Sequence, residues 1–78
     1  MAEKTDADRI KEIYKLCKSH FGDVRFVGLK YQTKIGWMAK AELGEDFENL
    51  TADGKTSTDA LRKLRDRVKK IIKRYNGV

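Results

Sequence analysis

Cys17 and His20 stand three residues apart in a segment of helical periodicity, a spacing that would let a thiol and an imidazole approach one another. A thiolate beside an imidazolium is the core of one nucleophilic mechanism. The sequence offers no third orienting group and no oxyanion loop, and a lone helical cysteine is more often a small buried hydrophobe. One cysteine and one histidine also fall short of a zinc ligand set. We therefore predict no catalytic residue, no metal site and no cofactor.

Acidic residues gather in the middle of the chain, where paired carboxylates could hold a cation or share acid and base roles. They are Glu42, Glu45, Asp46, Glu48 and Asp53. They lack the dense oxygen-ligand spacing of a calcium loop, so solvated turn residues are the better interpretation. The following Gly54-Lys55-Thr56 is similar to the end of a phosphate-binding loop but lacks its upstream glycine. A helix start beside Lys55 could still hold a phosphate oxygen.

Basic residues dominate the last third of the chain. The formal net charge is +6, and residues 55–78 hold nine basic against two acidic side chains. Two explanations stay open, a solvated helix face and a surface that tracks nucleic-acid phosphates. A membrane-surface helix is less attractive, because the apolar stripe of this segment is needed for the core. The phosphate interpretation selects as nucleic-acid-binding residues Lys55, Arg62, Lys63, Arg67, Lys69, Lys70, Lys73 and Arg74, with Lys34 and Lys40 as auxiliary residues.

The elements that must position these residues belong to a small chain. We predict one domain over residues 1–78 with a modest core, too small for a deep enclosed active site. Apolar residues make up 40% and charged residues 38%, which favours a folded module with a dense charge layer. The single cysteine, the polar start and the absence of a long apolar run predict a reducing cytoplasm and no membrane segment.

Two helices are predicted from capping and periodicity. The first spans residues 6–21, with Thr5 as its cap and Gly22 as its terminator. Its expected core side is formed by Ile10, Ile13, Tyr14, Cys17 and Phe21. The second spans residues 57–75, begins with Thr56 and Asp59 in the spacing of a capping box, and stops at Asn76-Gly77. Two basic stripes flank its apolar stripe, which consists of Leu61, Leu64, Val68, Ile71, Ile72 and Tyr75.

Three strands are predicted between the helices. Residues 24–31 change the phase of their alternation, which indicates a bulge near Gly28. Residues 34–43 alternate clearly, and their buried set is Ile35, Trp37, Ala39, Ala41 and Leu43. A shorter strand spans residues 47–52, with Leu50 and Ala52 inward. Trp37 is better explained as core than as a stacking platform, whereas Tyr31 or Phe47 would stack bases if it lay on the open face of the sheet.

The expected architecture is an α+β two-layer sandwich of order α-β-β-β-α. Because one sheet face and two apolar helix stripes need burial, a three-stranded antiparallel sheet should carry both helices on one face. A short link at Gln32 and Thr33 favours a hairpin between the first two strands. The other face should be open to water and carry Lys34, Met38, Lys40 and Glu42.

This order of elements resembles the double-stranded-RNA-binding domain, and the likeness covers most of the chain. The resemblance implies a phosphate grip by lysines at the start of the second helix. At that place this chain has Ser57, Thr58 and Asp59, with Lys55 before them and Arg62 after.

A local resemblance covers Gly54-Lys55-Thr56-Ser57-Thr58-Asp59-Ala60-Leu61, which is similar to a segment of HicB-like antitoxins. That resemblance implies a sheet and helix that sequester a toxin protein. The pattern also resembles small hypothetical proteins of bacteria and their phages, and this likeness implies no activity.

We therefore expect a small non-enzymatic binding module that contacts the phosphate backbone of DNA or RNA through its basic C-terminal helix, with low sequence specificity. The alternative is a protein–protein interaction module, antitoxin-like or a phage-encoded regulator, that binds an acidic partner through the same surface or through an open sheet edge.

Overall fold

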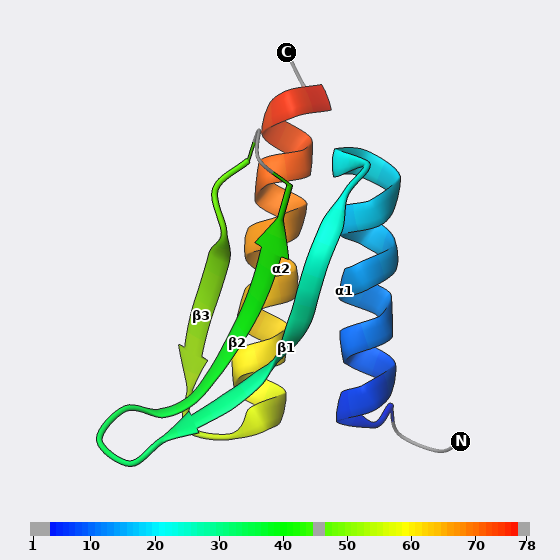
Figure 1. The fold of residues 1–78 in the computed structure, drawn as a ribbon. Coiled ribbons are helices and arrows are strands. Elements are labelled where there is room, and N and C mark those ends of the chain that lie inside the picture. The colour runs from blue at the N-terminus through cyan, green and yellow to red at the C-terminus, as the bar shows by residue number, and fades with distance from the viewer. Residues whose placement is uncertain (1–3, 45–46, 77–78) are drawn as a thin grey trace.

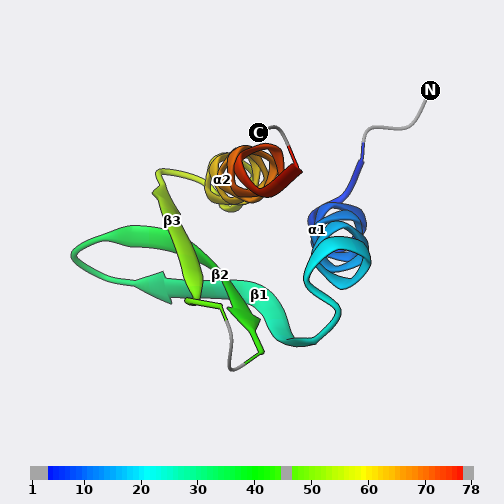
Figure 2. The same cartoon turned by 90° about the horizontal axis from the view of Figure 1, so that it is seen from above.

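Two helices and a three-stranded antiparallel sheet follow one another in the predicted order α-β-β-β-α (Figure 1). The computed structural model describes residues 4–44 and 47–76. The elements are α1 (Asp6–Phe21), β1 (Val24–Gln32), β2 (Gly36–Leu43), β3 (Leu50–Gly54) and α2 (Ser57–Asn76). The strand order is β1-β2-β3, and both helices lie on the same side of the sheet (Figure 2). The α+β two-layer prediction is confirmed.

Both helix starts form as the sequence predicts. The Thr5 hydroxyl accepts from the Asp8 amide at 3.1 Å and the Asp8 carboxylate accepts from the Thr5 amide at 3.2 Å, which completes a capping box. Thr56 accepts from the Asp59 amide at 3.1 Å in the same way. Gly22 ends α1 with a φ of +82°, a conformation that side chains with a Cβ rarely adopt. α1 and α2 run in the same direction, so both capped ends lie at one end of the molecule (Figure 1).

The core lies between the sheet and the two helices. Small residues on the sheet, Ala39, Ala41 and Ala52, let α2 approach closely, and each is buried. The fully buried side chains contributed by the helices are Ile13, Cys17, Ala60, Leu61, Leu64 and Val68. Ile71 and Ile72 of the predicted stripe are half-buried, while the side chain of Tyr75 lies outside the described part of the chain. None of the described helices is long and apolar enough to cross a bilayer.

The prediction that Tyr14 lies on the core side of α1 is wrong. Tyr14 is 42% exposed, and Leu16, which is not among the predicted core residues, packs against the core instead. Tyr14 and Leu16 lie on opposite flanks of the stripe through Ile13 and Cys17, because each residue turns the helix by about 100°. α2 covers the flank that carries Leu16, which leaves the Tyr14 flank open.

β1 contains a bulge, as predicted, but not at the predicted position. The register against β2 shifts between Val24 and Phe26, not at Gly28. The shift brings Val24 onto the same face as Val27, so both pack against the core. Phe26 is left on the open face, 48% exposed, with its ring over Gly28.

The predicted strand over residues 34–43 begins too early. Lys34 and Ile35 belong to a turn in which the Ile35 amide donates to the Gln32 carbonyl at 3.1 Å. Gly36, with a φ of +95°, returns the chain into β2. Ile35 is therefore 52% exposed instead of buried with Trp37, because this hairpin end extends beyond the helices (Figure 1).

The third strand is displaced toward the C-terminus, at Leu50–Gly54 instead of residues 47–52. Before it, the Asn49 side chain accepts from the Leu43 amide at 3.1 Å, which replaces a strand partner at the end of β2. Phe47 turns its ring toward Phe21, with 4.8 Å between the ring centroids. Gly54, predicted to break the strand, ends it within contact of α2: a Cβ there would lie 2.5 Å from the Ala60 amide nitrogen.

Candidate functional site

The predicted basic residues of α2 lie on two sides of that helix. Leu61, Leu64 and Val68 face the sheet, so the residues between them in sequence must flank this buried stripe or point away from it. One flank adjoins β3 and the other adjoins α1 (Figure 2). Asp59 and Asp66 are exposed and lie opposite the buried stripe, so they separate the two basic flanks along the first half of the helix.

The flank next to β3 carries three cations, Lys63, Arg67 and Lys70, which we call the β3-side cluster. They line a shallow depression together with Asp66, Asp53 and Ala52. Arg67 Nη1 donates to the backbone carbonyl of Thr51 at 2.9 Å, which covers part of the free edge of β3. This bond fixes the guanidinium beside the two lysines and leaves its other N–H groups available.

The flank next to α1 holds Arg62, Arg65 and Lys69, and its charge is partly neutralised. Arg65 Nη1 lies 3.3 Å from Glu12 Oε1 of α1, and Lys4 Nζ lies 2.9 Å from Glu12 Oε2. The hydrogen bond from Lys4 holds the pKa of Glu12 below its ordinary value, and the charges of Arg65 and Lys69 act in the same direction. Glu12 is therefore an anion that joins the two helices.

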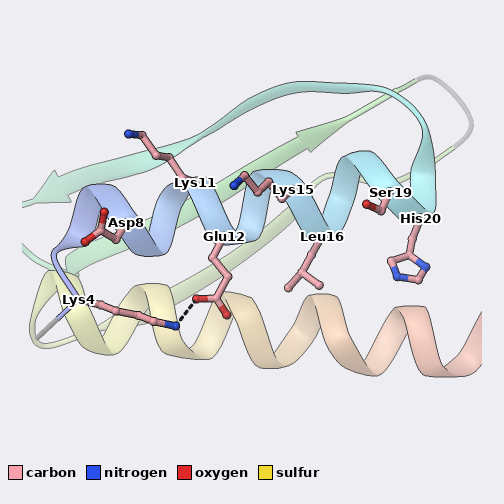
Figure 3. A pocket seen from close by; sticks show the side chains of 8 residues that line it. All are labelled: Lys4, Asp8, Lys11, Glu12, Lys15, Leu16, Ser19 and His20. Carbon is pink, nitrogen blue, oxygen red and sulfur yellow. Dashed lines mark hydrogen bonds and ion pairs between the residues drawn. The ribbon is translucent and has the colours of Figure 1, made fainter. Parts of the chain in front are cut away.

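A hollow on the outer side of α1 adjoins this flank (Figure 3). Figure 3 shows Glu12, Leu16 and His20 directed toward α2, whereas Lys11 points away from it. The hollow is lined by Lys4, Asp8, Lys11, Glu12, Lys15, Leu16, Ser19 and His20. Its cations are accompanied by Asp8 and Glu12, and the pKa of Asp8 is lowered by the hydrogen bond from the Thr5 amide. The β3-side depression has the same balance of three cations and two carboxylates, but in the hollow of α1 one of the cations, Lys4, is already paired with Glu12. This pairing makes the hollow a weaker anion site than the β3-side cluster.

The capped ends of the helices are joined by polar side chains. Asp6 accepts from the hydroxyls of Ser57 and Thr58, the latter at 3.1 Å, and lies 3.9 Å from Arg9 Nη1. Arg9 also donates to the Lys4 carbonyl. A second shallow depression here is lined by Lys4, Thr5, Asp6, Arg9, Thr58 and Arg62.

The remaining predicted residues are dispersed. Lys73 and Arg74 are exposed near the end of α2, and Lys55 is exposed between β3 and α2. Lys34 lies in the β1–β2 turn, away from the helix flanks. Lys40 is on the opposite face of the sheet, where its ammonium pairs with Glu42 at 3.0 Å. The structure thus brings Lys63, Arg67 and Lys70 together but does not bring the auxiliary lysines to them.

Cys17 and His20 do not form a reactive pair. The Cys17 side chain is fully buried in the core, and this burial raises the pKa of its thiol to about 11. His20 is exposed at the end of α1. No group of three potential metal ligands occurs among the described residues. Of the acidic cluster, Glu45 and Asp46 lie outside those residues, and Glu42 is paired with Lys40.

Among the aromatic residues, the sequence reasoning missed Phe26 as the one on the open face. Phe47 packs against Phe21 and the core. Tyr31, directly opposite Trp37 in the β1–β2 register, lies on the helix side of the sheet but remains 58% exposed. The sequence signal for an open-face ring is Phe26 followed two residues later by Gly28, because a ring at one strand position can cover a glycine on the same face.

Comparisons with known proteins give no further assignment. No family model, no curated protein and no solved structure matches this chain. The resemblances to the double-stranded-RNA-binding domain and to HicB-like antitoxins therefore stay predictions.

Proposed function

We propose that this chain is a small nucleic-acid-binding module and that α2 contacts the phosphate backbone with little sequence specificity. The observation that carries the proposal is the β3-side cluster, in which Lys63, Arg67 and Lys70 surround one shallow depression. Neither lysine has a hydrogen bond or ion pair to another residue of the described chain. The depression is also lined by Asp53 and Asp66, so its three cations leave a net positive charge. Cations grouped in this way favour backbone binding over a purely solvated face.

Arg67 supports this assignment because one hydrogen bond already holds its guanidinium at the depression. Its bond to the Thr51 carbonyl occupies one N–H group, and a guanidinium has further donors for phosphate oxygens. A held side chain loses less conformational entropy on binding than a freely moving one. Arg67 is thus the expected anchor, with Lys63 and Lys70 contributing charge on either side.

The test is a titration of the chain with duplex RNA, duplex DNA and single strands at a low and a high salt concentration. We expect affinity to fall steeply with salt, because each neutralised phosphate releases condensed counterions. The double variant K63A/K70A should lower the slope of log K against log salt by about two. The matched control K11A/K18A removes the same charge from exposed positions of α1. Absence of binding at low salt, or an equal loss in both variants, would contradict the proposal.

An acidic protein is the rival partner for the same cations. Polyglutamate of matched charge provides the comparison, because carboxylates and phosphates differ in charge density and geometry. If polyglutamate displaces the chain from RNA as well as a phosphate polymer does, the protein-binding alternative is favoured. Displacement only by the phosphate polymer supports the nucleic-acid proposal.

A further inference from the structure

The β1–β2 hairpin ends in an exposed apolar group that the helices do not cover. It consists of Tyr31, Ile35 and Trp37, which we call the tip cluster. Tyr31 is 58% exposed and Ile35 is 52% exposed, while Trp37 is half-buried and also packs against the core. Tyr31 and Trp37 are direct cross-strand partners whose ring centroids lie 5.3 Å apart at an interplanar angle of 64°. This edge-to-face arrangement leaves ring surface uncovered that a parallel stack would hide.

The fold does not require an apolar side chain at the exposed tip of this hairpin. The turn is made by the hydrogen bond from Ile35 to Gln32 and by the positive φ of Gly36, neither of which requires an isoleucine side chain. Phe26 offers a contrast, because its ring covers Gly28, with the ring Cζ 2.5 Å from where a Cβ would stand. Single exposed apolar residues are ordinary, but a grouped set at a projecting tip indicates a contact surface.

Cations outnumber acids around the tip cluster, which favours an anionic occupant. The cations are Lys30, Lys34 and Lys55, and the acids are Asp53, which is paired with Met38, and Asp59, which lies against Gly54. No acidic residue occurs in the sequence between Asp23 and Glu42, a segment that includes Lys30 and Lys34. Trp37 is paired with Gly54, and the exposed Lys55 follows directly. Lys34 is likewise exposed in the turn itself. An exposed aromatic ring face with lysines near it in the fold matches a nucleobase attached to a phosphate chain.

We propose that the tip cluster stacks an unpaired base of a single-stranded nucleic acid, with Lys34 and Lys55 beside the flanking phosphates. This inference rests on the proposed function and adds to it a preference for unpaired nucleotides. Stacking needs a base whose face is free, and in a duplex both faces of an internal base are covered by its neighbours. The β3-side cluster would follow the backbone of either form, whereas the tip cluster acts only on the single strand.

Trp37 makes the inference directly measurable, because it is the only tryptophan of the chain. The intact chain is titrated with a short oligouridylate and with an RNA duplex of the same length, and Trp37 emission is recorded beside the anisotropy of the labelled RNA. We expect the single strand to quench Trp37 and the duplex to leave it unchanged. Y31A should weaken single-strand binding about 5- to 150-fold, the range for losing one stacked base, and leave duplex binding unchanged. Y31F, which keeps the ring, should bind as the parent does.

The matched control is Y14A, which removes an exposed tyrosine from α1. Y31A binding equal to that of the parent, or an equal loss for single strand and duplex, would overturn the stacking inference while the salt-dependent binding by α2 stands. Loss of self-association in Y31A, measured by light scattering without RNA, would show that the tip cluster contacts a second copy and would also overturn it. No binding of any nucleic acid by the parent would reject the proposed function itself.

Discussion

The carboxylate of Asp6, the first residue of α1, accepts a hydrogen bond from the Thr58 hydroxyl of α2 at 3.1 Å, across 52 positions of sequence. The same carboxylate accepts from Ser57. Because α1 and α2 run in the same direction, the positive ends of their dipoles lie together, and an anion between them offsets their repulsion. Asp6 therefore contributes to the N-terminal end of both helices at once.

Replacing Asp6 with alanine should destabilise the fold by about 1–2 kcal/mol, because two hydroxyls lose a charged acceptor. T58V should cost less, since Ser57 keeps its bond to Asp6. Chemical denaturation followed by circular dichroism gives both values. D66N removes an exposed acid from α2 and should change stability by no more than about 0.5 kcal/mol. Equal effects of D6A and D66N would mean that only net charge matters here.

Glu12 should make the stability of the fold depend on pH in the acidic range. Its pKa is lowered in the folded chain, first by the hydrogen bond from Lys4, so its contribution is present above the ordinary value of 4.5 and is lost as pH falls through the folded value. E12Q should cost about 1 kcal/mol or less at neutral pH, and the difference from the parent should vanish in acid. Urea unfolding across this pH range measures the difference.

The control for this titration is E48Q, at an exposed glutamate between β2 and β3. A parallel fall of E12Q and parent below pH 4.5, with a constant gap, would contradict the role assigned to Glu12.

Gly54 and Gly28 should respond differently to alanine. A Cβ at Gly54 would lie 2.5 Å from the backbone nitrogen of Ala60, and neither segment can move without shifting α2. The three atoms nearest to a Cβ at Gly28 all belong to the ring of Phe26, a half-exposed side chain that can swing away. We expect G54A to destabilise the fold by about 2–3 kcal/mol and G28A by less than about 1 kcal/mol. Thermal melts of both variants decide this, and equal melting temperatures would refute it.

Local signals in the sequence were sufficient for the helices and for their order with the strands. Thr5 and Thr56 predicted the helix starts because capping involves only residues a turn apart. Leu61, Leu64 and Val68 predicted the buried side of α2, since their spacing is fixed by the helix itself. The basic surface of α2 follows from the same periodicity.

Features that depend on how one element is placed against another could not be predicted from the sequence. Ile35 continues the alternation of Trp37, yet nothing local tells that the hairpin extends beyond the helices. Tyr14 and Leu16 flank the same stripe, and only the position of α2 decides which is covered. The pairing of Arg65 with Glu12 likewise depends on the approach of α1 to α2, which periodicity does not encode.

Cys17 should be protected from thiol reagents in the folded chain. Burial keeps its pKa near 11, so little thiolate forms at neutral pH, and the core blocks access. Labelling with an aromatic disulfide should proceed only as fast as the chain opens, whereas the denatured chain should react fully at its one thiol. The raised pKa also links the free energy of unfolding to pH. The contribution of Cys17 to that free energy should be fully present below pH 9 and should decline as pH rises toward 11, because the thiol ionises more readily in the unfolded chain. Rapid labelling of the native chain would show that Cys17 is accessible.

The two flanks of α2 should contribute unequally to nucleic-acid binding. R62A/K69A removes two cations next to α1, where Glu12 and Asp6 already supply negative charge. K63A/K70A removes two from the β3-side cluster, which keeps Arg67 fixed at Thr51. We expect the second variant to reduce the salt slope by about two and the first by about one or less, because the proposed phosphate contacts of α2 are made by the β3-side cluster. Anisotropy titrations of one duplex at several salt concentrations measure both slopes, and a larger loss in R62A/K69A would move the interface to the α1 side of the helix.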